Sequence, residues 1–121
     1  MSKNIKSDSK ILKGIKNPTN SKYEIIITTQ EFTFFGVKNQ PDYGNIEIVY
    51  YPNKSVIELK SLKLYLQQYR NEIISYERVI NKVYEDLMKI YKPKKLIITI
   101  EFNSRGGIVS TLTIDSTLRK K

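Results

Sequence analysis

Residues 73–91 read IISYERVINKVYEDLMKIY, and the spacing of their apolar side chains decides the middle of the fold. Apolar residues return every three or four positions, which is the period of one face of an α-helix, while charged residues fill the other face. Lys92-Pro93-Lys94 follows directly, and a proline at this place ends a helix. The stretch predicts a long amphipathic helix after Asn71 whose core face holds Ile73, Tyr76, Ile80, Val83, Tyr84, Leu87 and Tyr91.

Shorter patterns on both sides of this helix complete the fold. Leu62, Leu66 and Tyr69 predict a preceding helix from Leu62 onward. β-Branched and alternating runs predict strands at residues 23–29, 46–51, 96–102 and 108–114. The order ββααββ favours an α+β domain, in which a four-stranded antiparallel sheet carries two helices on one face. Such a sheet leaves two edge strands, through which we expect copies of the chain to assemble as a homo-oligomer.

Two segments around the first strand lack a regular pattern. Residues 32–40 are apolar but irregular, and Gln40-Pro41-Asp42-Tyr43-Gly44 predicts a turn between the first two strands. Residues 1–21 are polar and rich in lysine, with a breaker cluster at residues 17–20. We therefore expect a flexible basic N-terminal tail at 1–21, one domain at 22–115 and a basic C-terminal tail at 116–121.

The net charge of +9 is concentrated at the two ends of the chain. Residues 1–22 hold six lysines and one aspartate, and the last six residues hold one arginine and two lysines. The 12 basic and 11 acidic residues between them nearly balance, which does not suit a basic nucleic-acid-binding body. Solvated ends are the favoured interpretation, and attraction of tRNA or DNA by the tails is the alternative.

The absence of cysteine and histidine from the 121 residues excludes several kinds of chemistry. Disulfides, thiolate nucleophiles, Ser-His-Asp triads and Cys- or His-ligated metals all require residues that the chain lacks. No metal site is therefore expected. No apolar run approaches the length of a membrane span and no signal peptide is evident, so the cytoplasm is the expected location.

One segment is specific enough to indicate a family. Glu58-Leu59-Lys60-Ser61-Leu62-Lys63-Leu64-Tyr65 resembles the signature of the QueF-type nitrile reductases, which reduce 7-cyano-7-deazaguanine (preQ0) to its aminomethyl form in queuosine biosynthesis. Three further segments agree in order and spacing: Gln40-Pro41-Asp42-Tyr43, then Tyr69-Arg70-Asn71 with Glu77, and Phe102-Asn103-Ser104-Arg105-Gly106-Gly107. The resemblance covers roughly residues 22–115. It implies a tunnelling (T-fold) architecture, in which protomers join edge to edge into rings with active sites between subunits.

The resemblance also implies roles for particular residues. In this family a Cys thiolate adds to the nitrile as a covalent thioimide, an Asp supplies a proton, and NADPH delivers two hydrides. By position Asp42 matches the acid, Glu77 matches the Glu that pairs with the base, and Glu58 with Leu59 faces the substrate. The implied NADPH contacts are Lys60, Lys63, Arg105, Gly106 and Gly107.

Each assignment has a simpler alternative. Asp42 after a proline could be a turn residue, and Glu77 could be one charge on the polar face of a helix. Lys60 and Lys63 could be solvated. Gly106 and Gly107 could serve only a hairpin turn.

The chain departs from the family at two positions. Gly36 falls at the place of the Cys and Tyr76 at the place of a family His, so a thioimide cannot form. The favoured hypothesis is addition of water or ammonia to the nitrile, with Asp42 as acid or base and Tyr76 donating to the developing amidate. The second is an NADPH-dependent reductase that transfers hydride directly. The third is a non-catalytic deazaguanine binder.

Overall fold

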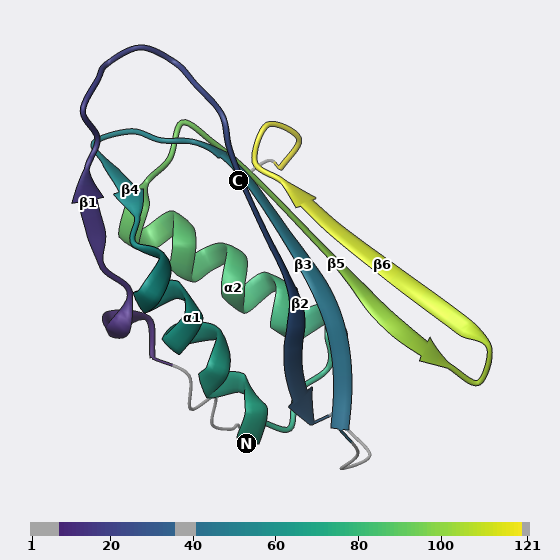
Figure 1. Ribbon diagram of the computed structural model, residues 1–121. Coiled ribbons are helices and arrows are strands. Elements are labelled where there is room, and N and C mark those ends of the chain that lie inside the picture. The colour runs from purple at the N-terminus through teal and green to yellow at the C-terminus, as the bar shows by residue number, and fades with distance from the viewer. Residues whose placement is uncertain (1–7, 36–40, 120–121) are drawn as a thin grey trace.

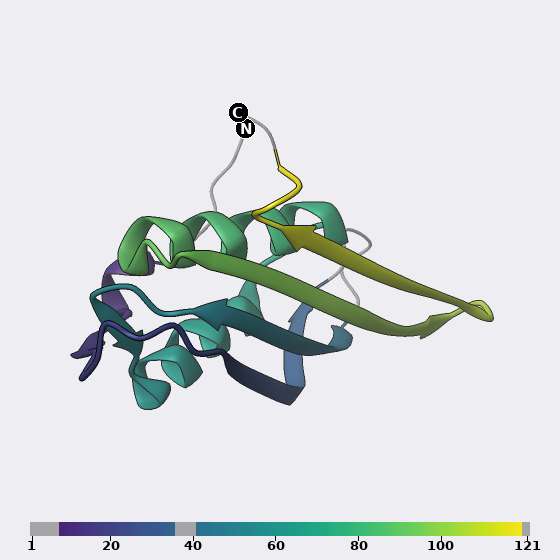
Figure 2. The same ribbon diagram turned by 90° about the horizontal axis from the view of Figure 1, so that it is seen from above.

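The computed structural model describes residues 8–35 and 41–119, which form a sheet with helices on one side (Figures 1 and 2). The main sheet has the order β2-β3-β5-β6, and every neighbouring pair is antiparallel. This arrangement confirms the predicted α+β class and four-stranded sheet; assembly into a ring stays a prediction. The elements are η1 (Ser9–Ile11), β1 (Gly14–Lys16), β2 (Ile25–Phe35), β3 (Pro41–Tyr51), β4 (Ser55–Ile57), α1 (Leu59–Gln67), η2 (Gln68–Asn71), α2 (Tyr76–Tyr91), β5 (Lys95–Arg105) and β6 (Ile108–Asp115).

Alternation along the central strands places the core between sheet and helices. On β3 the residues at 42, 44, 46, 48 and 50 are buried, while 43, 45 and 47 are exposed. Successive side chains of a strand point to opposite faces, so one face of β3 packs on the helices and the other is open. The same face of β5 contributes Leu96, Ile98, Ile100 and Phe102.

Local capping sets the ends of the two helices. The Ser75 side chain accepts a hydrogen bond from the Arg78 amide (3.2 Å), which starts α2 at Tyr76. Lys92 ends it in the left-handed conformation at φ 45°, directly before Pro93. The Glu58 carboxylate caps α1 by accepting from the Ser61 amide (2.7 Å), so α1 begins at Leu59 rather than at Leu62.

The predicted start of the long helix is wrong by several residues. Ile73 is 61% exposed and precedes the helix, because its segment lies against β2 instead. The Phe35 amide donates to the Glu72 carbonyl (2.8 Å) and the Ile74 amide donates to the Phe35 carbonyl (2.9 Å). These two bonds satisfy backbone groups that would otherwise have continued the helix.

The predicted turn at residues 40–44 is also wrong for the residues that the structure describes. β3 begins at Pro41, and Asp42 pairs with Phe34 while Gly44 pairs with Phe32. β2 correspondingly extends to Phe35 past a one-residue bulge between Thr29 and Phe32. The apolar residues of 32–35 are therefore strand residues, two of which are core.

Part of the expected flexible N-terminal tail is ordered. Residues 14–16 form β1, which pairs antiparallel with β4 (Figure 1). Leu12 is buried with the main core, and Ser9 is buried beside it in η1. The lysines of this segment are exposed, while its backbone packs on the domain. The polar composition of the segment therefore did not indicate that it is ordered.

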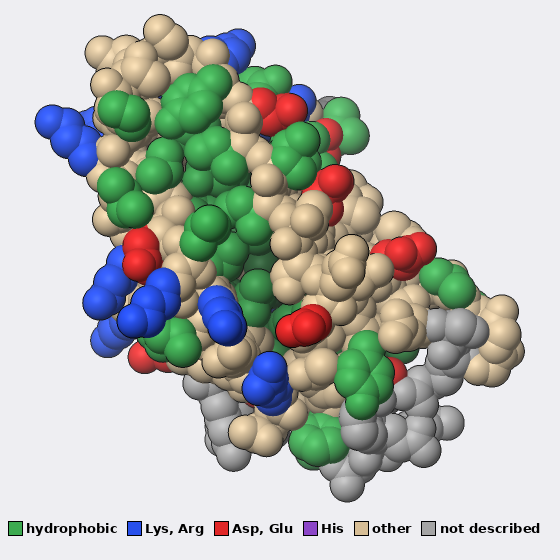
Figure 3. Space-filling model, viewed as in Figure 1, with side chains coloured by type: hydrophobic (Ala, Val, Ile, Leu, Met, Phe, Trp, Pro, Cys, Tyr) green, Lys and Arg blue, Asp and Glu red, His purple; other side chains and the backbone are tan. Residues whose placement is uncertain are grey.

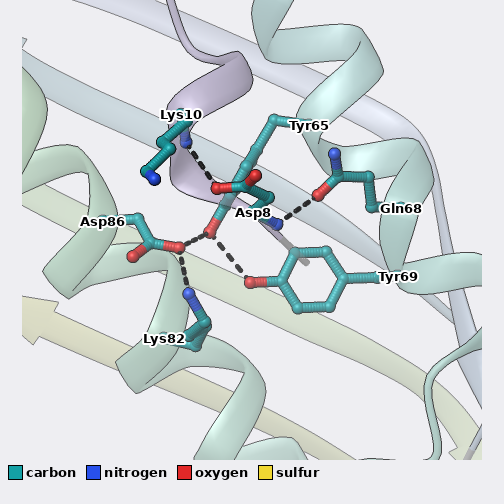
Figure 4. A network of polar contacts seen from close by, with 7 residues as sticks. All are labelled: Asp8, Lys10, Tyr65, Gln68, Tyr69, Lys82 and Asp86. Atoms are coloured by element: carbon teal, nitrogen blue, oxygen red, sulfur yellow. Dashed lines mark hydrogen bonds and ion pairs between the residues drawn. The ribbon is translucent and has the colours of Figure 1, made fainter. Parts of the chain in front are cut away.

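A buried polar chain joins α1, η2 and α2 (Figure 4). The Tyr65 hydroxyl donates to an Asp86 carboxylate oxygen (2.5 Å), and the Lys82 ammonium lies 2.6 Å from the same oxygen. The Tyr69 hydroxyl lies 2.8 Å from that of Tyr65, which leaves Tyr69 as the donor of this pair. Burial, with the neighbouring Tyr69 and Asp86, raises the pKa of Tyr65 far above its ordinary value. The hydroxyl therefore stays protonated, and remains a donor, at pH values at which an exposed tyrosine would ionise.

Candidate functional site

Two of the predicted catalytic residues lie at one end of the sheet. Asp42 is 7% exposed and its side chain is on the helix-facing side of β3, directly across from Phe34. The Tyr76 ring stacks on Phe102 with centroids 3.9 Å apart and planes 8° from parallel, and it meets Phe34 edge-on. Asp42 and Tyr76 are thus both next to Phe34. The structure places an acid and a phenol around a wall of aromatic rings.

Glu77 lies beside them on the first turn of α2. Its side chain is exposed, and it stands at the end of the helix where backbone amides point outward and the dipole is positive. An exposed carboxylate in this position can accept hydrogen bonds from a ligand without first losing a protein partner. The geometry is compatible with base recognition and equally with a solvated charge.

Glu72 is a buried carboxylate at this end that the sequence did not single out. It is 5% exposed, and its backbone carbonyl accepts a hydrogen bond from the amide of Phe35, the last described residue of β2. The signal available in the sequence was its place directly after the Tyr69-Arg70-Asn71 motif. Glu72 thereby positions the end of β2 that leads toward residues 36–40. Gly36, the predicted position of the missing nucleophile, lies outside the described residues.

Glu58 and Leu59 lie at the opposite end of the domain. The Ile57 amide donates to the Tyr50 hydroxyl (2.9 Å), which ties the start of α1 to the end of β3. Tyr50 and Asp42 are eight positions apart on β3, a separation of about 26 Å at roughly 3.3 Å per residue. Within one chain, Glu58 and Asp42 therefore belong to different sites.

A cavity of about 290 Å³ lies between β2 and α1 and includes one of the predicted cofactor-binding lysines. Figure 3 shows apolar side chains along this face, with Lys and Arg side chains gathered beside them. Lys63 and Arg70 line the cavity together with the apolar side chains of Phe32, Leu62 and Leu66. Cations beside an apolar wall suit a ligand that combines a phosphate with a flat ring. Lys60 is exposed on the same helix but does not line the cavity.

The predicted contacts at Gly106 and Gly107 are in a third place. Both glycines have left-handed backbones, at φ 62° and 81°, and connect β5 to β6. A Cβ at either position would meet no atom within 4 Å, so the turn itself requires glycine while the space around it is open. Figures 1 and 2 both show this turn projecting away from α1. Lys63 lies beside β2, and the glycines adjoin β6 at the other edge of the sheet, so the structure does not bring these predicted contacts together within one chain. Arg105 is the last residue of β5.

Comparison with known proteins identifies the family. A family model described as QueF-like protein matches residues 41–121. The NADPH-dependent 7-cyano-7-deazaguanine reductase of Thermomicrobium roseum is 44% identical over 107 residues, which are 87% of this chain and 84% of that protein. The chain belongs to the QueF-like family. The reductase of the same name from Chloroherpeton thalassium is 47% identical over 95 residues, covering 78% of this chain and 82% of that protein.

A solved member of the QueF-like group has the same fold. The crystal structure of the archaeosine synthase QueF-Like in the apo form superposes with a TM-score of 0.71 over 76% of this chain and 91% of that one, at 15% identity. The likeness supports the T-fold arrangement of sheet and helices. Its low identity carries no residue role to this chain.

Two kinds of feature, a metal site and a membrane-spanning helix, were sought among the described residues. No group of three acidic side chains that could hold a metal ion occurs in residues 8–35 and 41–119. Within the same ranges, neither α1 nor α2 is long and apolar enough to cross a membrane.

Proposed function

We propose that this chain is an enzyme of 7-deazaguanine metabolism that binds 7-cyano-7-deazaguanine and reduces its nitrile with NADPH. The observation that carries this proposal is 44% identity, over 87% of the chain, to a protein named as that reductase. The retained Asp42 supports it, because it matches the family's acid. Glu58, Glu77 and Lys63 support it too, because they match residues that contact the base and the cofactor in the family.

Base recognition is assigned to two carboxylates, the exposed one of Glu77 and the half-buried one of Glu58. A guanine-type edge offers a ring N–H and an exocyclic amine side by side, and a carboxylate accepts both in a charge-assisted pair. Glu77 can do this from the start of α2. Glu58 uses one carboxylate oxygen to cap α1, and its other oxygen is available to a ligand.

Proton supply is assigned to Asp42 and Tyr76. Reduction of a nitrile to an amine adds two hydrides to carbon and two protons to nitrogen, so each step needs an acid close to the nitrogen. Asp42 is buried on the helix-facing side of β3, where a proton donor is shielded from water. Tyr76, held by its stack on Phe102, would donate a hydrogen bond to the nitrogen as negative charge develops.

NADPH, when bound, supplies the hydrides, and its phosphates are assigned to the cavity between β2 and α1. Lys63 and Arg70 are the cations in that cavity, and Lys60 extends from the same helix. These residues lie on the α1 side of the domain, whereas Asp42 lies at the start of β3. Because Glu58 and Asp42 lie at opposite ends of one chain, we expect a complete site to combine two copies, the first contributing Glu58 and α1 and the second contributing Asp42, Tyr76 and Glu77.

The absence of cysteine favours a second candidate reaction. A thioimide cannot form in this chain, so hydride would have to reach the nitrile carbon directly. Addition of water or ammonia needs no hydride and requires only an acid and a base near the nitrile, which Asp42 and Tyr76 could provide. The products would be an amide or an amidine at the same carbon.

One experiment separates these reactions. The protein is incubated with 7-cyano-7-deazaguanine, with and without NADPH, and the base is examined by mass spectrometry. A gain of four hydrogens that requires NADPH supports reduction. A gain of one water or one ammonia without NADPH replaces it with addition. Saturable binding of an unchanged base would reduce the proposal to a binder, and no binding would overturn both reactions.

Matched variants locate the reaction in the site. Asp42→Asn is expected to remove turnover and keep the base bound. Glu85→Gln changes an exposed carboxylate two turns further along α2 from Glu77, and it should leave turnover unchanged. Equal loss in both variants would show that the effect is not specific to Asp42.

A further inference from the structure

The backbone of Lys13 forms hydrogen bonds with three residues from two other segments. Its amide donates to the Ser61 hydroxyl oxygen (2.9 Å). Its carbonyl accepts from the Glu58 amide (3.1 Å) and from the Tyr91 hydroxyl (2.6 Å). One residue of the N-terminal segment thus joins the start of α1 to the end of α2.

We propose that residues 8–16, here named the N-terminal strap, position the Glu58 carboxylate for its ligand. The proposal rests on the function proposed above, in which Glu58 faces the base. It assigns a role to a segment that lies outside the matched family region, residues 41–121. Lys13, Ser61 and Tyr91 are positioning residues in this proposal, because they act on the base through Glu58.

The contacts around Glu58 explain how the strap could act. The Glu58 amide is held by Lys13, its carbonyl accepts from the Ser61 hydroxyl (2.8 Å), and its Oε1 atom accepts from the Ser61 amide (2.7 Å). Ser61 is 3% exposed and is itself held by Lys13. Both ends of the Glu58 residue, backbone and side chain, are therefore connected to the strap by short contacts. This restricts the direction in which the remaining Oε2 atom can point.

Two further features keep the strap in register with Glu58. β1 pairs with β4 from Gly14 opposite Ile57 to Lys16 opposite Ser55, so the paired residues end one position before Glu58. A Cβ at Gly14 would lie 3.1 Å from the Ser55 Cβ, which shows how closely the two strands approach. Tyr91 is buried at the end of α2, so its hydroxyl has little freedom to find another partner.

The strap also connects the two ends of one chain that contribute to different copies of the proposed site. α2 carries Tyr76 and Glu77 at its first turn and Tyr91 at its last residue. The Tyr91 hydroxyl reaches the strap, and the strap holds Glu58. One helix and one backbone contact thereby link the Glu58 end of a chain, which contributes to one site, to its Glu77 end, which contributes to another.

The test is the Tyr91→Phe variant, which removes one hydroxyl and keeps the ring. Tyr23→Phe is its matched control, since the Tyr23 hydroxyl donates to the Asn17 side chain (2.8 Å) just beyond the strap. We expect Tyr91→Phe to weaken binding of 7-cyano-7-deazaguanine roughly fivefold, the effect of one neutral hydrogen bond. Tyr23→Phe should leave the affinity unchanged.

A double-mutant cycle distinguishes positioning from mere support of the fold. In a Glu58→Gln background, the loss caused by Tyr91→Phe should largely disappear, because the strap would no longer have a carboxylate to orient. An equal loss in both backgrounds would overturn the proposal. Ser61→Thr, which keeps the hydroxyl, should retain more affinity than Ser61→Ala.

Amide hydrogen exchange tests the strap without any ligand. Tyr91→Phe should speed exchange at the Glu58 and Ser61 amides and leave the central β3 amides protected. Unchanged exchange at Glu58 and Ser61 would overturn the proposal even if the base binds. If exchange responds as expected but the wild-type chain binds no base, the strap holds Glu58 and the proposed function is what fails.

Discussion

Removal of the Tyr65 hydroxyl tests the buried polar chain between the helices. Tyr65→Phe deletes the bond to the Asp86 carboxylate (2.5 Å) and the contact with the Tyr69 hydroxyl (2.8 Å). A hydrogen bond to a charged group contributes about 1.5–3 kcal/mol, and a neutral one contributes about 1 kcal/mol. Because Asp86 keeps Lys82, the expected loss in the free energy of unfolding is about 3 kcal/mol.

Chemical denaturation at one fixed protein concentration measures this loss. Tyr84→Phe is the control. Tyr84 is buried like Tyr65 but lies on α2, and its ring centroid is 4.7 Å from the Cζ atom of Arg119. The Tyr84 hydroxyl donates no hydrogen bond to any described residue, so its removal should change stability by less than about 1 kcal/mol. If Tyr65→Phe costs no more than Tyr84→Phe, the buried carboxylate does not depend on the tyrosine and the reasoning is refuted.

A second variant tests whether Asp86 is the residue on which the Tyr65 hydroxyl depends. Asp86→Asn leaves an amide where Tyr65 and Lys82 meet a carboxylate, so it should be destabilising by itself. The two substitutions together should cost less than the sum of their separate effects, because each removes the same bond. Strict additivity would show that Tyr65 and Asp86 do not depend on each other.

Four further outcomes are expected. Glu77→Gln should weaken binding of 7-cyano-7-deazaguanine roughly tenfold or more in a titration, since a charge-assisted bond is lost; unchanged affinity would make Glu77 a surface charge. Asp42→Asn should abolish product in the mass-spectrometric assay while the titration still shows binding, and retained turnover would remove its role as acid. Lys63→Ala and Arg70→Ala should each lower NADP⁺ affinity roughly tenfold at low salt and less at high salt, as for phosphate contacts, and insensitivity to both would exclude the cavity as the phosphate site. Burial raises the pKa of Tyr91 to about 12 from its ordinary 10.0, so the unfolded chain loses this proton first, and the free energy of unfolding should fall as the pH rises above 10. The denaturation midpoint should fall less steeply with pH in Tyr91→Phe than in the unchanged chain. The same dependence on pH in both would contradict the raised pKa of Tyr91.

The helical and strand patterns predicted the fold class because they depend on neighbouring residues. The period of Ile80, Val83, Tyr84, Leu87 and Tyr91 defines a helix face wherever that helix packs, and all five are buried. Alternation in residues 46–51 likewise defines one buried face of a strand. The order of these elements then favoured a one-sided antiparallel sheet, which the structure has.

The boundaries and the N-terminal segment could not be predicted in this way. Ile73 continues the helical period but lies outside α2, because the backbone around it bonds to Phe35, 38 positions earlier in the chain. Lys13 contacts Ser61 and Tyr91 through its backbone amide and carbonyl. Every residue except proline has these backbone groups, so no side-chain pattern marks such a contact in advance.

For the candidate site too, some properties followed from the sequence and others only from the tertiary structure. The sequence alone determined that the chain has the signature residues of the QueF-like family and lacks cysteine, because motif identity and composition need no coordinates. Only the tertiary structure decided that Asp42 is a buried strand residue beside Phe34 rather than part of a turn. It also decided that Glu58 and Asp42 lie at opposite ends of the domain, because Glu58 follows a segment tied to Tyr50, and Tyr50 is about 26 Å from Asp42 along β3 at roughly 3.3 Å for each residue. Spacing along the chain names the residues of a site, and the path of the chain in space decides which of them can meet.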